Sequence, residues 1–154
     1  MIVFNNLESA LIIAKRAGMI YHDGVHSCIA RIELTSEGKW ETRGGVIFTD
    51  YNFVSIQGHM ASAVDGSKWI NKEVLFHVFN YVFNICACKK WIVQCPASNE
   101  KALALDLHFG FSAEARIEDV LPDGAMLILG MYREQCRFLK VGDSSDGKKL
   151  CPSP

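Results

Sequence analysis

The sequence predicts an α/β fold: a mixed, mostly antiparallel central sheet with helices on both faces, in the order β-α-β-β-β-α-β-α-β-β. Alternating apolar and polar runs joined by short turns occupy residues 28–61, which is typical of antiparallel hairpins. Residues 69–84 then change to helical spacing. From residue 91 onward, strand-like and helix-like segments alternate before a closing hairpin, which indicates a sheet covered by helices.

Length and composition fit one globular domain. The chain has 154 residues, of which 49% are hydrophobic and 21% are charged. This is the balance of a folded chain, and the length suits one well-formed core better than two. We expect residues 1–140 to form a single domain and residues 141–154, which are polar and rich in Gly, Ser and Pro, to form a frayed tail.

Charge and hydropathy exclude several classes of partner. The formal net charge is -1 and the pI is near 6.5, which argues against nucleic acid and anionic membranes as partners. No apolar run approaches the roughly 18 residues that a membrane span needs. The N-terminus lacks the basic region of a secretory signal. We therefore expect a cytoplasmic protein.

The first half of the chain is expected to form a short strand, a helix and a three-stranded meander. Residues 1–4 have a strand-like pattern. Asn5 or Asn6 can cap a helix that begins at Leu7 and weakens near Gly18, because short polar side chains accept hydrogen bonds from the free N–H groups of a first turn. The strands of the meander are expected at 28–35, 40–49 and 53–61.

The second half is expected to alternate between helix and strand. A strongly amphipathic helix is predicted over about 69–84. A buried strand follows around Trp91, and Pro96 ends its pairing. Ser98 is expected to cap the next helix, and Gly110 to close it. That helix is expected at 99–108, and the closing strands at 113–119 and 125–135.

The cysteines suggest buried thiols rather than a metal site. They are Cys28, Cys86, Cys88, Cys95, Cys136 and Cys151. None forms a CxxC pair, and the pair at 86 and 88 has no second pair at zinc spacing. Reduced cysteines that pack as small apolar residues are expected, and no metal is expected. Cys28, Cys95 and Cys136, on expected strands, are the candidates for a nucleophilic thiol.

A motif after the strand at Trp91 carries a family resemblance. The next helix begins with Asn99-x-x-Ala102 and closes with Gly110-Phe111. This combination resembles the acyl-CoA-binding core of the GNAT superfamily of N-acetyltransferases. Segments 67–83 and 123–139 resemble a phage-encoded branch of that superfamily. The likeness covers most of residues 28–139 and implies a GNAT-like fold. It also implies acetyl-CoA as cosubstrate and an amine acceptor, either a small molecule or a protein.

The chain departs from the usual cofactor loop of that superfamily. The usual signature is Gln or Arg followed by x-x-Gly-x-Gly or Ala at the start of the central helix, whereas this chain has Asp65-Gly66-Ser67-Lys68-Trp69. The requirement is a set of backbone N–H groups at a helix N-terminus, aimed at the pyrophosphate. The resemblance therefore implies cofactor contacts at Gly66, Ser67, Lys68 and Trp69, where Lys68 adds a positive charge.

Further cofactor contacts are implied on two other segments. Gly58 and Met60 lie on the strand whose backbone pairs with the pantetheine arm in the superfamily. Asn99 and Ala102 lie where the superfamily reaches the same arm across the splay of two strands. An ordinary strand glycine and a simple helix cap are the alternative readings of Gly58 and Asn99.

Three residues are candidates for acid–base chemistry. Asp106 stands where many members of the superfamily carry the tyrosine that protonates the leaving thiolate, four residues before the closing glycine. A carboxyl donates a proton near neutral pH only where burial raises its pKa. His59 has an intrinsic pKa that suits a general base for the acceptor amine. Glu33 is a second candidate for the base.

Two functions of different class follow. The leading hypothesis is an acyl-CoA-dependent N-acyltransferase that works by direct transfer. The alternative is a non-catalytic GNAT-like structural or host-interaction protein of a bacteriophage, with phage or host proteins as partners in the host cytoplasm or the virion. The missing tyrosine and the single loop glycine motivate this alternative. A toxin-type acetyltransferase acting on tRNA or ribosomal protein draws little support from the near-neutral charge.

Overall fold

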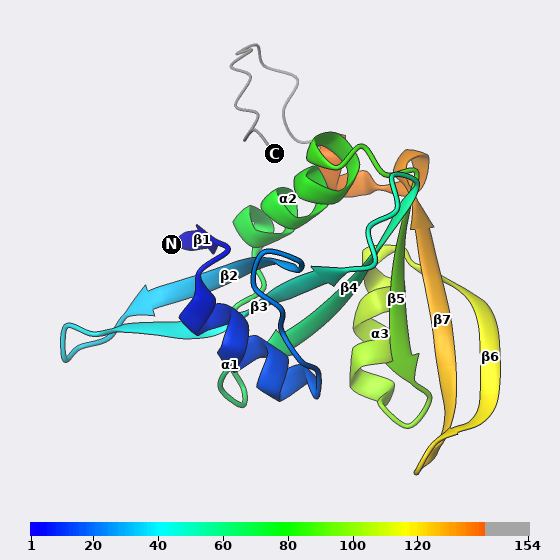
Figure 1. Cartoon of the computed structure of the whole chain (residues 1–154), viewed down its shortest axis with the longest axis horizontal. Helices are drawn as coiled ribbons and strands as arrows, with labels where there is room; N and C mark the ends of the chain where they lie inside the picture. Colours follow the sequence, from blue (N-terminus) through cyan, green and yellow to red (C-terminus); the bar gives the residue numbers. More distant parts are fainter. Residues whose placement is uncertain (141–154) are drawn as a thin grey trace.

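A computed structural model describes residues 1–140, and the expected order of strands and helices is confirmed (Figure 1). The strands are β1 (Ile2–Phe4), β2 (Ser27–Leu34), β3 (Trp40–Thr49), β4 (Ser55–Ser62), β5 (Lys90–Pro96), β6 (Ser112–Leu121) and β7 (Gly124–Tyr132). The helices are α1 (Leu7–Ala17), α2 (Lys72–Asn80) and α3 (Glu100–Phe109), with a π-helical turn at Tyr81–Ile85 and 3-10 turns at Arg133–Gln135 and Arg137–Lys140. The expected polar tail, residues 141–154, lies outside the described residues.

The strands form one seven-stranded sheet in the order β1-β2-β3-β4-β5-β7-β6. All neighbouring strands run antiparallel except β4 and β5, which are parallel. Their registered pairs extend only from Ser55 opposite Lys90 to Gly58 opposite Val93. The rest of β4 continues without β5 alongside it, so the sheet opens at this point (Figure 1). The mixed, mostly antiparallel sheet is therefore confirmed.

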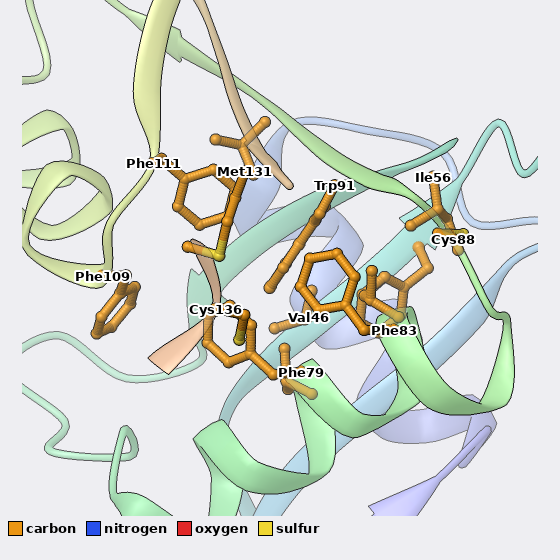
Figure 2. Packing of buried hydrophobic residues seen from close by; sticks show 14 of the residues in the cluster. Val46, Ile56, Phe79, Phe83, Cys88, Trp91, Phe109, Phe111, Met131 and Cys136 are labelled. Atoms are coloured by element: carbon orange, nitrogen blue, oxygen red, sulfur yellow. The ribbon is translucent and has the colours of Figure 1, made fainter. Parts of the chain in front are cut away.

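The larger core lies on the sheet face that α2 and α3 cover. Trp91 of β5 is fully buried at its centre, beside Phe79 and Phe111 (Figure 2). Its ring centroid lies 5.0 Å from that of Phe79, 5.1 Å from that of Phe111 and 5.9 Å from that of Phe48. Aromatic side chains bury large apolar areas, so this cluster ties both helices to the sheet.

The opposite face carries a smaller core beneath α1. Ala10, Ile13 and Ala14 of α1 are buried against Cys28 of β2 and Ile47 of β3. Their spacing follows one side of a helix, which the amphipathic pattern predicts. Helices thus cover both faces, as expected.

The helix caps decide between two expected residues in one case and correct the expectation in the other. Asn6, rather than Asn5, caps α1, because its side-chain oxygen accepts the Ser9 N–H at 2.9 Å. Asn99, rather than Ser98, caps α3. Ser98 instead donates its hydroxyl to Asp123 in the turn between β6 and β7. Both residue types suit a cap, and the tertiary contact decides between the neighbours.

The helix expected over 69–84 begins later and changes form. Asn71 caps it, accepting the Val74 N–H at 2.8 Å, so α2 starts at Lys72. Trp69 is drawn out of the helix because its indole packs on Gly44 of β3, where a Cβ would come within 2.5 Å of the ring. After Asn80 the helix continues as the π-helical turn.

Two strand ends also differ from expectation. Strand β4 begins at Ser55 rather than residue 53, because the Asn52 side chain accepts the N–H groups of Val54 and Ser55 at 3.0 and 2.8 Å and holds a turn there. Strand β7 ends at Tyr132 rather than residue 135. The Gln135 side chain accepts the Tyr132 N–H at 2.9 Å and closes a 3-10 turn.

Within residues 1–140, no helix has the length and apolar character needed to cross a bilayer.

Candidate active site

A cleft of about 320 Å³ opens where β4 and β5 diverge. Its walls come from the last turn of α1, the second half of β4, the end of the loop before α2, the end of β5 and one side of α3. Most of the residues predicted for the site are brought together here, namely Gly58, His59, Met60, Trp69, Asn99, Ala102 and Asp106. Segments far apart in sequence therefore meet in one hollow of the sheet.

Gly58 lies at the floor of the cleft, at the last registered pair of β4 and β5. A Cβ at this position would lie 2.4 Å from Nε1 of Trp91, so the packing of the indole requires glycine. The Trp91 N–H is itself buried and has no hydrogen-bond partner within residues 1–140. Gly58 is thus more than an ordinary strand residue, since it lets β4 and β5 approach before they separate.

Asp106 lies on the side of α3 that lines the cleft, and only 5% of its surface is exposed. Burial raises the pKa of its carboxyl from 3.8 to about 6. An ion-pair partner for this carboxyl is absent among residues 1–140. The condition under which a carboxyl donates a proton near neutral pH is therefore met.

His59 is half-buried on β4 and also lines the cleft. Its Nε2 lies 3.2 Å from the hydroxyl of Thr49 on β3. Burial lowers the pKa of the imidazole; the negative charge of Asp50 opposes that effect and His26 adds to it. A lowered pKa keeps the ring neutral near pH 7, which is the form that accepts a proton.

Asn99 caps the start of α3 and lines the cleft. Its side-chain oxygen accepts the Ala102 N–H at 3.2 Å, which completes the cap. The cap uses only Oδ1, so the exposed side-chain amide retains its Nδ2 donors at the edge of the cleft.

Solved structures share this arrangement of strands and helices. Spermidine N-acetyltransferase from Vibrio cholerae in complex with CoA and spermine matches with a TM-score of 0.60 and 16% identity, over 74% of this chain and 69% of that chain. A variant of the same organism's enzyme, SpeG, matches with a TM-score of 0.64 and 15% identity, over 90% of this chain and 96% of that one. The chain has the GNAT fold. No protein-family model and no curated protein sequence matches it.

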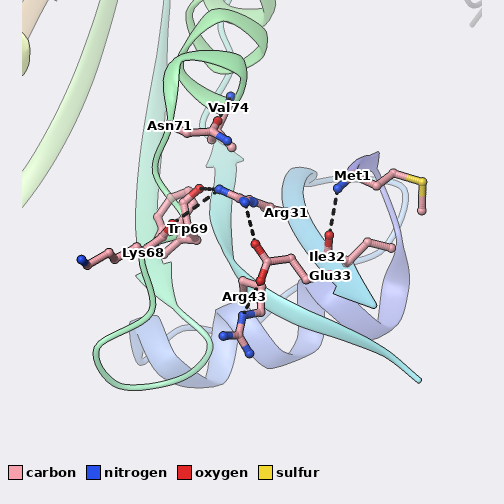
Figure 3. A network of polar contacts seen from close by, with 9 residues as sticks. All are labelled: Met1, Arg31, Ile32, Glu33, Arg43, Lys68, Trp69, Asn71 and Val74. Atoms are coloured by element: carbon pink, nitrogen blue, oxygen red, sulfur yellow. Dashed lines mark hydrogen bonds and ion pairs between the residues drawn. The ribbon is translucent and has the colours of Figure 1, made fainter. Parts of the chain in front are cut away.

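The loop before α2 departs from the GNAT cofactor loop more than the sequence indicates. Gly66, Ser67 and Lys68 do not line the cleft, and α2 begins only at Lys72. The loop is instead tied to β2, because the Arg31 guanidinium donates to the carbonyls of Lys68 and Trp69 at 3.4 and 3.3 Å (Figure 3). The expectation that these residues stand at a helix N-terminus is therefore wrong.

Trp69 and Ile70 are the residues of this loop that line the cleft. The Trp69 indole N–H donates to the Ser62 hydroxyl at 3.0 Å, which joins the loop to the end of β4. The Ser67 hydroxyl is buried without a partner within the described part of the chain.

Glu33 lies outside the cleft. Its carboxylate is paired with Arg31 at 2.5 Å and with Arg43 at 3.2 Å on the adjacent strand (Figure 3). Both ion pairs hold the Glu33 side chain on the surface of the sheet, away from the cleft. The structure thus does not bring Glu33 to the other predicted catalytic residues.

Arg16 is a cleft residue that the sequence analysis missed. It belongs to the last turn of α1, donates to the Ser62 carbonyl at 3.1 Å and is ion-paired with Asp65. A basic residue near a helix C-terminus is common for helix-dipole reasons alone, so its sequence context carried no signal. It places a positive charge beside the end of β4.

The described cysteines are free thiols, and burial raises the pKa of each of them. Burial raises the pKa of Cys28 to about 12 and that of Cys95, which also lies near the Asp106 carboxylate, to about 11. Burial raises the pKa of Cys136 as well, and this residue follows a 3-10 turn instead of lying on a strand. Because the thiolate is the reactive form, these buried thiols are poorly suited to act as nucleophiles. Cys151 lies outside the described residues.

Proposed function

We propose that the chain is an acyl-CoA-dependent N-acyltransferase that transfers an acetyl group from acetyl-CoA to a primary amine in one direct step. The observation that carries the proposal is Asp106, a carboxyl with a raised pKa in the wall of an open cleft between diverging strands. The GNAT-fold neighbours support it, because one of them is an N-acetyltransferase in complex with CoA and spermine.

The cleft fits the reactive arm of the cosubstrate. A volume of about 320 Å³ is at the lower end of small-molecule sites, so it suits the acetyl-pantetheine arm rather than the whole of CoA. The backbone at Gly58 and Met60 and the side-chain amide of Asn99 would hold the amide groups of the arm. Trp69 and Ala102 would supply apolar walls.

Acetyl-CoA supplies an activated thioester carbonyl to this site. His59 would take the proton that the attacking amine loses as its nitrogen bonds to the carbonyl carbon. Asp106, of which roughly a tenth is protonated at pH 7 with a pKa of about 6, would give a proton to the sulfur as the carbon–sulfur bond breaks. Much of the rate would come from holding the two reactants together.

Calorimetric titration with acetyl-CoA tests the binding half of the proposal. We expect saturable one-to-one binding that weakens in Asn99→Ala. Asn99→Asp is the matched variant, because it keeps an oxygen for the cap and removes the amide donors. Weak binding in both variants indicates a ligand contact, whereas weak binding in Asn99→Ala alone indicates only a lost cap. Absence of heat with the unaltered protein at high micromolar acetyl-CoA would rule the proposal out.

The acceptor is best sought among amines. The neighbouring structures are spermidine N-acetyltransferases, so spermidine and spermine come first in a screen, followed by other small amines and lysine-containing peptides. Release of free thiol from acetyl-CoA, measured with and without each amine, identifies the acceptor.

The non-catalytic phage or host-interaction protein is the alternative. The loop before α2 favours it, since Gly66, Ser67 and Lys68 stand away from the cleft and from the helix N-terminus. A phage origin, a location in host cytoplasm or virion, and phage or host partners all remain predictions. A stable complex with such a protein, together with no acetyl-CoA binding, would favour this alternative over the enzyme.

A further inference from the structure

Beside the cleft, the side chains of Asp50, Thr49 and His59 are linked in that order by hydrogen bonds. The Thr49 hydroxyl donates to Oδ2 of Asp50 at 2.6 Å and lies 3.2 Å from Nε2 of His59. Thr49 is buried with 7% of its surface exposed, whereas Asp50 is exposed at the end of β3. Thr49 does not line the cleft, whereas His59 does, so Thr49 contacts His59 from outside the cleft lining.

The direction of these hydrogen bonds follows from proton counting. An ionised Asp50 carboxylate only accepts, so the single hydroxyl proton of Thr49 is committed to it. Thr49 can then only accept from His59, which requires the proton of the neutral ring to be on Nε2. Nδ1 is left with a free lone pair.

The backbone at Asp50 indicates that this geometry is held in place. Its φ is 53°, in the left-handed region that residues other than glycine adopt at a cost. Aspartate tolerates this region better than most residues, and the conformation lets its carboxylate reach the side chain of the residue before it. Thr49 pairs with Gln57 across the strands, so its hydroxyl reaches His59 diagonally on the same face of the sheet.

We propose that Thr49 and Asp50 are positioning residues, which hold His59 as the Nε2–H tautomer so that Nδ1 is the base for the acceptor amine. This inference rests on the proposed function. When the amine proton moves to Nδ1, the ring becomes an imidazolium whose Nε2–H still donates to Thr49. The carboxylate of Asp50 then faces the new positive charge through one hydroxyl.

Other titratable and charged groups near His59 also affect its pKa, so their effects must be distinguished from that of Asp50 in a pH experiment. His26, in the segment before β2, opposes protonation of His59, and its own Nδ1 accepts the His22 N–H at 3.2 Å. Arg16 of α1 reaches β4 at Ser62 but is paired with Asp65. Asp50 is thus the group that favours the charged form of His59.

Nitrogen NMR of the histidine rings in the full-length protein tests the tautomer without any need for activity, and His59→Gln identifies the signals. We expect the proton on Nε2 in the unaltered protein. Thr49→Val should lose this preference, and Thr49→Ser should retain it. Asp50→Asn should keep the tautomer, because an amide oxygen still accepts from Thr49. Because Asp50→Asn removes the negative charge that raises the pKa of His59, that pKa should fall further.

Kinetics then test the catalytic consequence. Thr49→Val should lower kcat about 10- to 100-fold with little change in KM for acetyl-CoA, and Thr49→Ser should restore kcat. Asp50→Asn should move the acidic limb of the pH profile to lower pH. A proton on Nδ1 in the unaltered protein, or an unchanged kcat in Thr49→Val, would overturn the inference. Failure of the proposed function would give a different result: the unaltered protein would show the expected tautomer but no acetyl transfer. In that case Thr49 and Asp50 would position His59 without a role in catalysis.

Discussion

At the residue scale, Asp106 shows how burial changes the acid–base properties of a side chain. By sequence alone it is a charged residue in the last turns of a helix, where a solvent-exposed position is the ordinary expectation. In the structure it is buried beside Cys95, and its pKa rises to about 6. Burial and the absence of a counter-ion within residues 1–140 together give it proton-donating capacity that an exposed aspartate lacks.

If Asp106 protonates the leaving thiolate, kcat for acetyl transfer should fall as pH rises through about 6, because the carboxyl loses its proton. Asp106→Asn removes that proton donor, so we expect kcat to fall about 100-fold and this alkaline limb to disappear. Steady-state assays from pH 5 to 9 measure both effects, with Asp119→Asn on exposed β6 as the control. An alkaline limb that persists in Asp106→Asn would assign it to another group.

Asp106 should also make the protein less stable as pH rises. Because its folded pKa lies above the ordinary 3.8, the folded state binds the proton more tightly than the unfolded state. The full stabilisation is present below pH 4 and is lost as pH rises through about 6, a change of roughly 3 kcal/mol. Relative to the unaltered protein, Asp106→Asn should gain free energy of unfolding between pH 4 and 8. Urea unfolding at both pH values measures this difference, and a constant difference would contradict the burial argument.

Site residues could be predicted from the sequence where they belong to a motif. They could not be predicted where only tertiary packing brings them to the cleft. Asn99 and Ala102 were found through a motif, and the structure does place them at the cleft. Arg16 and the Thr49–Asp50 pair carry no motif, since their neighbourhood depends on how α1 and β3 pack against β4. Glu33 was misplaced because strand alternation does not reveal that arginines on two strands engage it.

At the element scale, patterns located the helices and strands, and tertiary contacts decided their ends. The apolar period of α2 is plain in the sequence, yet the helix starts at Lys72, because Asn71 caps it and Trp69 packs on Gly44. Local propensity alone does not separate a tryptophan inside a helix from one just before it. The register of β4 with β5 depends in the same way on Gly58 beneath the Trp91 indole.

Gly58→Ala should therefore damage the junction of β4 and β5. The new Cβ would lie 2.4 Å from Nε1 and 2.8 Å from Cε2 of Trp91, so either the ring or the strand must move. We expect a loss of about 1–3 kcal/mol in the free energy of unfolding, the usual range for overpacking. A double-mutant cycle with Trp91→Phe, measured by chemical denaturation, tests the cause. Additive losses would show that the clash with the indole is not responsible.

At the scale of the whole molecule, the cleft is a consequence of one parallel pair in an otherwise antiparallel sheet. Strands β1 to β4 form one wing, β5 to β7 form the other, and the wings share registered pairs only from Ser55 to Gly58 (Figure 1). The order of elements predicted this sheet, because a helix between β4 and β5 permits a parallel crossover. The opening itself was implied only by the family resemblance, since no sequence pattern marks the residue at which two strands separate.

A ligand in the cleft should stabilise both wings together. The lining residues come from β4 on one wing and from β5 and α3 on the other, so a molecule bound between them contacts both. At 100 times the Kd, acetyl-CoA should add about 2.7 kcal/mol and raise Tm by roughly 5–10 °C. Hydrogen exchange should show added protection along both 59–62 and 93–95, with ADP, which lacks the pantetheine arm, as the control ligand. Because the pantetheine arm would span the gap, protection of one wall alone would mean that acetyl-CoA binds on the surface of one wing and not in the opening between β4 and β5.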